Sequence, residues 1–379
     1  MSEIIFWIII AIIFYIYLGY PIITLAISLL INNKVNKKEN EPPVTFLITA
    51  FNEEKNIKEK LEDTLGLDYP KEKLQIIVAS DASNDRTDEI VKEFAEQGVL
   101  LHRVEGRVGK TETQNQTVKR ARGEIIIFSD ATTKYKKDAI RKIVRNYYDP
   151  SVGAVSGRYE YINPTGAPVG SGTILFWKYE NFVKSRQTQI KTVTGCCGCI
   201  YSVRRDLYEP LPRDIISDLV EPLKILEKGY RIAFEPEAVA YETTEEKPEE
   251  EFSMRVRVIT RGMNGLLYTK SLFNPFRYRF VSFQLISHKV LRWLIPFFLI
   301  ILFVSNAFLL DKTFYKITFL LQIAFYLSAP IAWVMERFGK KMKLLFIPLY
   351  FCLVNLASLR ATLNIIKGKK MTVWETIRK

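Results

Sequence analysis

The stretch "GEIIIFSDATT", residues 123–133, decides the fold, because four consecutive apolar residues lead straight into a lone carboxylate, Asp130. Two earlier segments repeat the design: "VTFLITAFNEE", residues 44–54, and "LQIIVASDASNDRTDEI", residues 74–90. Each apolar run predicts a buried strand, and each is followed by an acidic turn and a helical pattern. A fourth strand is expected in "VGAVSGRYEYI", residues 152–162. Strands that alternate with helices predict a largely parallel α/β sheet.

The acidic turns are expected at one edge of this sheet, where parallel α/β sheets bind their ligands. Asp81 ends the second strand and Asp130 the next long one. Either aspartate alone is also a good N-cap for the helix that follows; together they favour a polar ligand pocket. Between them, "EGRVGKTETQN", residues 105–115, is a basic turn that can bring Lys110 to a phosphate, although it matches neither a Walker loop nor GxGxxG.

The hydrophobic fraction of 48% is concentrated at the two ends of the chain. Residues 4–31 carry no charge and exceed the roughly 20 residues that cross a bilayer. Without a basic start or a cleavage site, this run predicts an anchor rather than a signal peptide, kinked near Pro21. Three later blocks are apolar: 293–310 and 317–335 are long enough to span, whereas 344–359 is marginal because Arg360 interrupts it.

The net charge of +13 does not indicate a nucleic-acid partner, because basic residues cluster beside the membrane segments. One cluster follows the first span and another separates the last two blocks: Lys34, Lys37 and Lys38, then Arg337, Lys340, Lys341 and Lys343. The positive-inside rule places both, and the central domain, in the cytoplasm. Four full spans would leave Lys367, Lys369 and Lys370 outside, so the final block is expected to be re-entrant or interfacial, with the tail inside.

Three of the four cysteines, Cys196, Cys197 and Cys199, fall within four residues. A disulfide framework does not suit a cytosolic face. A metal site needs about four ligands, and the only histidines are His102 and His288. We therefore interpret the cysteines as small packing residues beside a pocket.

At this point the chain resembles a known family. The order of "ITAFNEE", "VASDASNDRTDEI", "GRVGKTETQN", "IIIFSDATT", "TGCCGCIYSVRRDLY", "ISDLVEPLKILEKGYRIAFEPEA" and "RVRVITRG" is similar to that in membrane-bound family 2 glycosyltransferases. The group with cellulose, hyaluronan and poly-N-acetylglucosamine synthases is the most similar. The resemblance implies a GT-A fold, Rossmann-like with a mostly parallel sheet. It divides the chain into an anchor (1–33), a GT-A domain (34–251), interface helices (252–292) and a C-terminal transmembrane region with a basic tail (293–379).

The resemblance also implies roles for individual residues. Asp81 would contact the base of the donor nucleotide beside a loop that contains Ala50, Asn52 and Glu53. Lys110 would approach the donor phosphates, and Asp130, the first acid of the DxD motif, would touch the ribose or a Mg²⁺ or Mn²⁺ ion. Asp218 would be the general base. The acceptor pocket would be shaped by Gly195, Cys196, Cys197 and Gly198.

Two departures from the family pattern stand out. Thr132 occupies the place of the second DxD acid, which leaves Asp130 as the obvious metal carboxylate. Mg²⁺ often uses one or two carboxylates and takes its other ligands from phosphates and water, so the donor can complete the site. The segment "RVRVITRG", residues 255–262, stands where the family carries QxxRW but lacks Gln and Trp, which puts processive synthesis in question.

The residue chemistry leaves alternatives open. Asp218 at a predicted turn can be a general base or the N-cap of a helix over 219–228. The basic and aromatic residues 251–293 predict helices in the membrane interface, with Arg277, Arg279 and Lys289 at headgroups and with Arg257 and Arg261 in the pocket.

The expected function is inverting transfer from a UDP-sugar to a glycan acceptor at the cytoplasmic face of the cell membrane, in synthesis of a β-linked polysaccharide. Single-sugar transfer to a polyprenyl phosphate or glycolipid is the nearest rival. A third possibility is an inactive scaffold that keeps the nucleotide pocket. The expected partners are the donor, a glycan or lipid-linked acceptor and the lipid bilayer.

Overall fold

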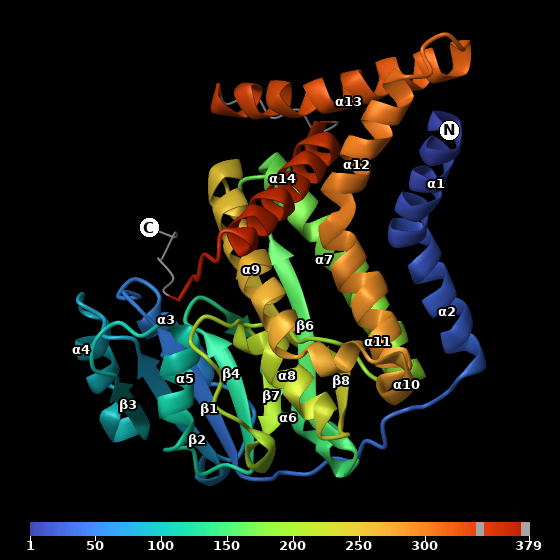
Figure 1. Ribbon diagram of the computed structural model, residues 1–379. Helices are drawn as coiled ribbons and strands as arrows, with labels where there is room; N and C mark the ends of the chain where they lie inside the picture. The colour runs from blue at the N-terminus through green and yellow to red at the C-terminus, as the bar shows by residue number, and fades with distance from the viewer. Residues whose placement is uncertain (339–344, 373–379) are drawn as a thin grey trace.

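A computed structural model describes residues 1–338 and 345–372 of the chain (Figure 1). Its centre is a mixed eight-stranded sheet with the order β3-β2-β1-β4-β7-β6-β8-β5. Neighbours are parallel from β3 to β4 and again between β6 and β8, and antiparallel elsewhere. The strands are β1 Val44–Ala50, β2 Leu74–Ser80, β3 Val99–Arg103, β4 Ile125–Asp130, β5 Lys134–Tyr135, β6 Val152–Ile162, β7 Tyr201–Arg204 and β8 Arg231–Thr243.

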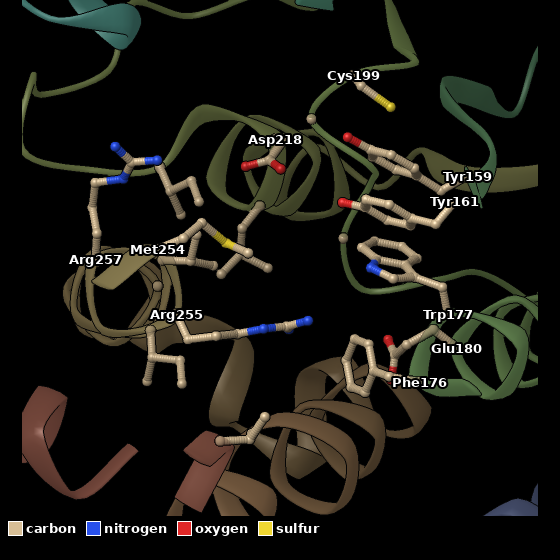
Figure 2. A pocket seen from close by; sticks show the side chains of 18 of the residues that line it. Tyr159, Tyr161, Phe176, Trp177, Glu180, Cys199, Asp218, Met254, Arg255 and Arg257 are labelled. Carbon is tan, nitrogen blue, oxygen red and sulfur yellow. The ribbon is translucent and has the colours of Figure 1, made fainter. Parts of the chain in front are cut away.

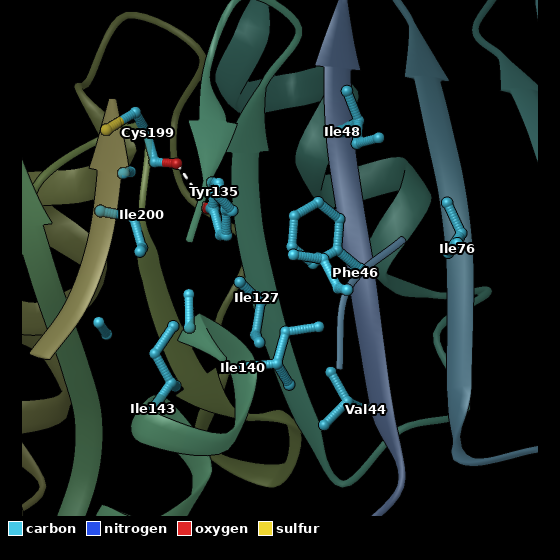
Figure 3. Packing of buried hydrophobic residues seen from close by; sticks show 14 of the residues in the cluster. Val44, Phe46, Ile48, Ile76, Ile127, Tyr135, Ile140, Ile143, Cys199 and Ile200 are labelled. Carbon is cyan, nitrogen blue, oxygen red and sulfur yellow. Dashed lines mark hydrogen bonds between the residues drawn. The ribbon is translucent and has the colours of Figure 1, made fainter. Parts of the chain in front are cut away.

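Helices cover both faces of the sheet because the strand side chains alternate. Val44, Phe46 and Ile48 of β1 pack into one apolar cluster with α3, α4 and α6 (Figure 3), whereas Leu47 points into the cluster on the opposite face, with α5, α8 and α11. These helices are α3 Ile57–Leu65, α4 Thr87–Lys92, α5 Lys110–Val118, α6 Ala139–Val144, α8 Ser217–Glu227 and α11 Phe280–Leu285. The GT-A-like α/β fold and its mostly parallel sheet are confirmed.

The four strands expected from the sequence are all present, but two of them are separated by a strand that no prediction included. β7 lies between β4 and β6 and pairs antiparallel with both. With four residues it is too short to give a periodic signal of its own. Its insertion moves β6 and β8 away from β1 and β2, so that Asp130 at the end of β4 lies near the middle of the sheet.

Four helical stretches are long and apolar enough to cross a membrane: Ser2–Leu30, Phe280–Ala307, Thr313–Glu336 and Phe346–Ile366. The first consists of α1 (Ser2–Phe14), a π-helical turn (Tyr15–Gly19) just before Pro21, and α2 (Tyr20–Leu30). The second begins at Phe280, earlier than expected, because α11 runs through a π-turn (Ile286–Val290) into α12 (Leu291–Ala307). The others are α13 (Thr313–Arg337) and α14 (Phe346–Ile366).

Two expectations about charged residues in these helices were wrong. Arg360 does not interrupt the last apolar block; it is exposed on α14, where a long side chain can reach out of an apolar environment. Lys289 does not lie with Arg277 and Arg279 at an outer surface. Those two arginines are exposed around α10 (Pro275–Tyr278), whereas Lys289 lines the internal cavity described below.

Two ion pairs show which ends of the chain lie together. Glu3 pairs with Lys312 at 2.7 Å, so the N-terminus lies beside the connection between α12 and α13. Lys370 pairs with Asp214 at 3.2 Å, so the segment after α14 returns to the sheet domain. Figure 1 shows α13 running crosswise over the ends of α12 and α14. Of the expected basic cluster before α14, the Arg337 side chain and Lys340, Lys341 and Lys343 lie outside the described residues.

Candidate active site

A cavity of about 830 Å³ opens at the carboxyl edge of the sheet (Figure 2). Its floor is formed by the ends of β4 and β6 and the start of α8, and its walls by α7 (Pro168–Ile190), α9 (Pro248–Tyr268), α12 and α14. This volume lies in the upper part of the range for small-molecule sites. Asp130, Asp218 and membrane-helix residues such as Phe351 line the same cavity.

Asp130 and Lys110 form an ion pair at the sheet edge of the cavity. The β1–β4 register sets Asp130 beside Thr49, and Lys110 is the first residue of α5. Both side chains are partly exposed, at 34% for Asp130 and 23% for Lys110. A cation and a carboxylate that both face the cavity suit a phosphate-bearing ligand, in which Lys110 contacts the phosphate and Asp130 a hydroxyl or a metal ion.

Glu242 supplies a carboxylate where the sequence has Thr132 instead of an acid. Thr132 Oγ1 donates a hydrogen bond of 2.5 Å to Glu242 Oε1, and Tyr159 donates one of 2.6 Å to the other oxygen. Glu242 comes from β8 and lines the cavity with Asp130. The sequence analysis missed it because it lies 110 residues from Thr132; the acidic end of the last long strand was the available signal.

Asp81 does not line the cavity. It is fully buried, and its carboxylate accepts hydrogen bonds from Val108 N (2.8 Å), Gly109 N (3.0 Å) and Thr113 Oγ1 (3.0 Å). It therefore fixes the loop that presents Lys110, and a direct contact with a nucleotide base stays a prediction.

The loop after β1 holds the other expected donor-binding residues. Glu53 lines the cavity, whereas Ala50 is buried in the core. Asn52 adopts a left-handed conformation (φ 54°) and accepts a hydrogen bond of 2.9 Å from Asn84 N. This bond ties the loop after β1 to the loop after β2.

Three of the four expected acceptor-pocket residues line the cavity: Gly195, Cys196 and Gly198. Cys197 is buried beneath them, and its Sγ accepts a hydrogen bond of 3.1 Å from Lys184. Position 198 requires a glycine for a steric reason, since a Cβ there would stand 2.7 Å from Asp218 Oδ2. A larger residue would push the carboxylate of Asp218 away.

Asp218 is not the N-cap of its helix. The cap position of α8 is Ile216, and Asp218 is the second helical residue, facing the cavity. Within the described residues, no side-chain or backbone donor forms a hydrogen bond to its carboxylate. Burial raises the pKa of the Asp218 carboxyl, although Lys110 and Arg261 oppose this rise. A carboxylate with a raised pKa that faces a cavity is suited to accept a proton.

Two of the three arginines of α9, Arg257 and Arg261, behave differently. Arg257 lines the cavity, and burial lowers its pKa, which Asp130 and Glu245 partly offset. Arg261 is buried at 6% exposure and donates to Thr111 Oγ1 (2.9 Å) and Ile215 O (2.5 Å). Burial lowers the pKa of Arg261 to about 10. Arg261 thus joins α9 to α5 and the loop before α8, and it also reaches the cavity.

A tryptophan lies against Gly262, the residue after Arg261, although "RVRVITRG" contains none. The indole of Trp293, on α12, covers Gly262 so closely that a Cβ there would meet it at 3.0 Å. Trp293 lines the cavity. The sequence analysis missed this contact, but a glycine inside the pattern of a helix was a signal for the close approach of another side chain.

The sheet order, the cavity at its carboxyl edge and the pairing of Lys110 with Asp130 define an α/β enzyme of the GT-A class. Residues 45–211 match the glycosyl transferase family 2 model, so the chain contains a glycosyltransferase family 2 domain.

Two curated relatives extend the similarity beyond the matched domain. The chain is 27% identical over 311 residues to a probable glycosyltransferase, YdaM, of Bacillus subtilis, covering 78% of this chain and 72% of that one. It is 29% identical over 272 residues to the poly-β-1,6-N-acetyl-D-glucosamine synthase of Staphylococcus aureus, covering 69% and 63%. The match thus spans less than two thirds of the synthase.

One solved structure shares the fold over nearly the whole chain. It is the mannosyltransferase PcManGT from Pyrobaculum calidifontis, determined in complex with GDP-mannose and Mn²⁺. The TM-score is 0.76, with 98% of this chain and 100% of that chain covered, at 20% sequence identity. At this identity the comparison establishes the fold, including the arrangement of the flanking helices.

Proposed function

We propose that the protein transfers a sugar from a nucleotide diphosphate sugar to an acceptor hydroxyl, with inversion at the anomeric carbon. The observation that supports this proposal most directly is that Lys110, Asp130 and Asp218 line one cavity at the edge of a family 2 domain. Lys110 and Asp130 have the chemistry of a diphosphate site, and Asp218 that of a base.

In the proposed reaction, Asp218 accepts the proton of the acceptor hydroxyl as the acceptor oxygen bonds to the anomeric carbon. The bond from that carbon to the diphosphate oxygen breaks, and the nucleoside diphosphate leaves with the bonding electrons. Lys110 stabilises the negative charge on the leaving group. A positioned base typically contributes about 10²–10⁴-fold to the rate.

The oxygen ligands present fit a divalent cation. Asp130, with Glu242 beside Thr132, offers carboxylates to Mg²⁺ or Mn²⁺, which take further ligands from phosphates and water. When bound, such an ion neutralises the leaving diphosphate. Lys110 provides the positive charge beside Asp130 in this structure.

The donor and product are proposed from the relatives and the sequence together. We propose a UDP-sugar donor and a β-linked glycan product, since the Staphylococcus aureus relative is named for a polymer of β-1,6-linked N-acetylglucosamine. GDP-mannose, bound in the solved mannosyltransferase, is the alternative donor to test. We place the reaction at the cytoplasmic face of the membrane, because Lys34, Lys37 and Lys38 follow the first apolar helix.

One observation favours single-sugar transfer to a lipid-linked acceptor as a second candidate. The cavity continues between the apolar helices, where Leu18, Ile347 and Phe351 line it. An acceptor with a lipid tail can occupy such a space while its sugar or phosphate reaches Asp218.

The decisive experiment uses the purified full chain in lipid nanodiscs and measures nucleoside diphosphate release from a panel of UDP- and GDP-sugars. Release that depends on Mg²⁺ or Mn²⁺ supports the proposal. Sizing of the products separates long glycans from a singly glycosylated lipid. If no donor is turned over while nucleotides still bind, the protein is an inactive scaffold and the proposal is wrong.

A further inference from the structure

Three aromatic side chains form a continuous wall on the side of the cavity opposite Arg257 (Figure 2). Tyr159 and Tyr161 lie two residues apart on β6 and therefore point to the same face, with ring centroids 4.6 Å apart and planes only 4° from parallel. Trp177 of α7 lies against both, 4.9 Å from Tyr159 and 6.1 Å from Tyr161. We call Tyr159, Tyr161 and Trp177 the aromatic wall.

The aromatic wall is held in place from behind. Tyr159 is buried, donates through its hydroxyl to Glu242 and accepts through its backbone oxygen from Asn181 Nδ2 at 3.0 Å. Tyr161 and Trp177 are only partly buried and line the cavity. Large aromatic rings that stay partly exposed inside a cavity offer preorganised contact area to a ligand at little cost in conformational entropy.

The position of the wall separates it from the donor end of the cavity. In the sheet order, the Asp81 loop follows β2, Asp130 ends β4, and the tyrosines lie on β6, on the far side of β4 from β2. Figure 2 shows Tyr161 and Trp177 facing the space below Asp218, with Arg255 at its opposite border. A molecule that stacks on the wall thus lies beside the proposed base rather than beside the nucleotide loop.

We propose that Tyr161 and Trp177 form the subsite for the terminal sugar ring of the acceptor. A pyranose has an apolar C–H face, which stacks on an aromatic ring, and a rim of hydroxyls, which stays free to bond to polar groups. Stacking on the wall leaves the rim directed at Asp218. This inference rests on the proposed function, and it adds that the acceptor ends in a sugar, whether the rest is a glycan or a lipid.

The test compares three variants of α7 in the full chain in nanodiscs: Trp177→Ala, Trp177→Phe and Phe182→Ala. Phe182 is an exposed aromatic residue of the same helix that does not line the cavity, so it is the matched control. The measurement is nucleoside diphosphate release with water alone and with two added sugars: a β-1,6-linked N-acetylglucosamine pentasaccharide and a mannose disaccharide. The nucleotide dissociation constant is measured on each variant.

We expect Trp177→Ala to raise the KM for the stimulating sugar about tenfold, while release to water and nucleotide affinity change less than about twofold. Trp177→Phe should recover most of the loss because it restores a flat ring, and Phe182→Ala should match the wild type. The inference is overturned if Trp177→Ala keeps the wild-type KM, if it weakens nucleotide binding instead, or if neither sugar stimulates the wild type. If the wild type releases no nucleoside diphosphate at all, the proposed function itself fails.

Discussion

Near Asp130, the fold brings a carboxylate from a distant strand beside the incomplete motif. The chain has Thr132 where a second acid is expected, yet the Thr132 hydroxyl holds Glu242 of β8 at 2.5 Å. A threonine at this position orients a carboxylate instead of providing one. The carboxylate of Glu242 thus lies beside Thr132 and lines the same cavity as Asp130.

Because of this contact, Thr132→Asp would put a second carboxylate against Glu242. Like charges at this distance repel, so the variant should unfold at a lower temperature without metal and gain more stability from Mn²⁺ than the wild type. Asp130→Asn should lose the stabilisation by Mn²⁺ and nucleoside diphosphate. Thermal unfolding of both variants and the wild type, with and without Mn²⁺, checks these two predictions. An equal Mn²⁺ shift in all three proteins would argue against a metal role for these side chains.

The candidate residues could be found from sequence where a short segment carries its own chemistry. Lys110, Asp130 and Asp218 each follow a strand or turn signal, and all three line the cavity. Glu242, Trp177 and Trp293 could not be found in this way, because their roles depend on contacts across the fold. Asp81 was correctly placed at the sheet edge, but its hydrogen bonds to the following loop are invisible in the sequence pattern.

At the scale of elements, α8 carries both the proposed base and a second buried acid, Glu221. Glu221 is 0% exposed, and burial raises the pKa of its carboxyl to about 8. One of its oxygens has no hydrogen-bond partner within the described residues, and the other accepts from Glu209 N at 3.3 Å. The folded chain therefore retains a proton on Glu221 at a pH where the unfolded chain has lost it.

The sign of the pH dependence follows from this difference. Between the ordinary glutamate pKa of 4.5 and about 8, the folded state binds more protons, so the free energy of unfolding falls as pH rises and levels off above about 8. Glu221→Gln should remove this loss. The variant should therefore gain more unfolding temperature over the wild type at pH 8 than at pH 5, and the difference between the two gains should correspond to more than about 1 kcal/mol. Glu96→Gln, at an exposed position, is the control. A Glu221→Gln shift that is equal at both pH values would refute this account.

The elements themselves were predictable to the extent that they are long and periodic. β1, β2, β4 and β6 lie within the stretches where strands were expected, whereas β7 has four residues and β5 has two, too few for a periodic signal. Residues 252–292 were expected to form interface helices with Arg257 and Arg261 in the pocket. α9 packs against α8 and α14 and carries both arginines to the cavity, whereas the position of these helices relative to the membrane stays a prediction. An amphipathic pattern does not reveal whether the partner of the apolar face is lipid or protein.

At the scale of the whole molecule, two ion pairs place the two ends of the described chain at opposite ends of the long helices. Glu3 lies with Lys312 at one end of the helices, and Lys370 lies with Asp214 of the sheet domain at the other. Residue 370 and the sheet domain, which includes the exposed Asn84, therefore lie at the same end of the molecule, and the N-terminus lies at the opposite end. With the positive-inside rule, we predict from this arrangement that residue 370 lies on the cytoplasmic side.

Cysteine labelling of intact cells tests this topology. Asn84→Cys, at an exposed position of the sheet domain, and Lys370→Cys should be protected from a membrane-impermeant thiol reagent until the cells are opened, whereas Ser2→Cys should react at once. The background is the quadruple variant in which the native cysteines are replaced by serine or alanine. Reaction of residue 370 from outside, with residue 84 protected, would show that residue 370 and the sheet domain lie on different sides.

The most direct test of the central claim is Asp218→Asn, measured for sugar transfer and nucleoside diphosphate binding on the same purified protein. Asparagine keeps the shape of the side chain and removes the base. We predict at least about a hundredfold loss of transfer with little change in nucleotide affinity, while Asp206→Asn, at an exposed position off the cavity, behaves as the wild type. Near-normal transfer by Asp218→Asn, or a parallel loss of nucleotide binding, would contradict the assignment of Asp218 as the general base.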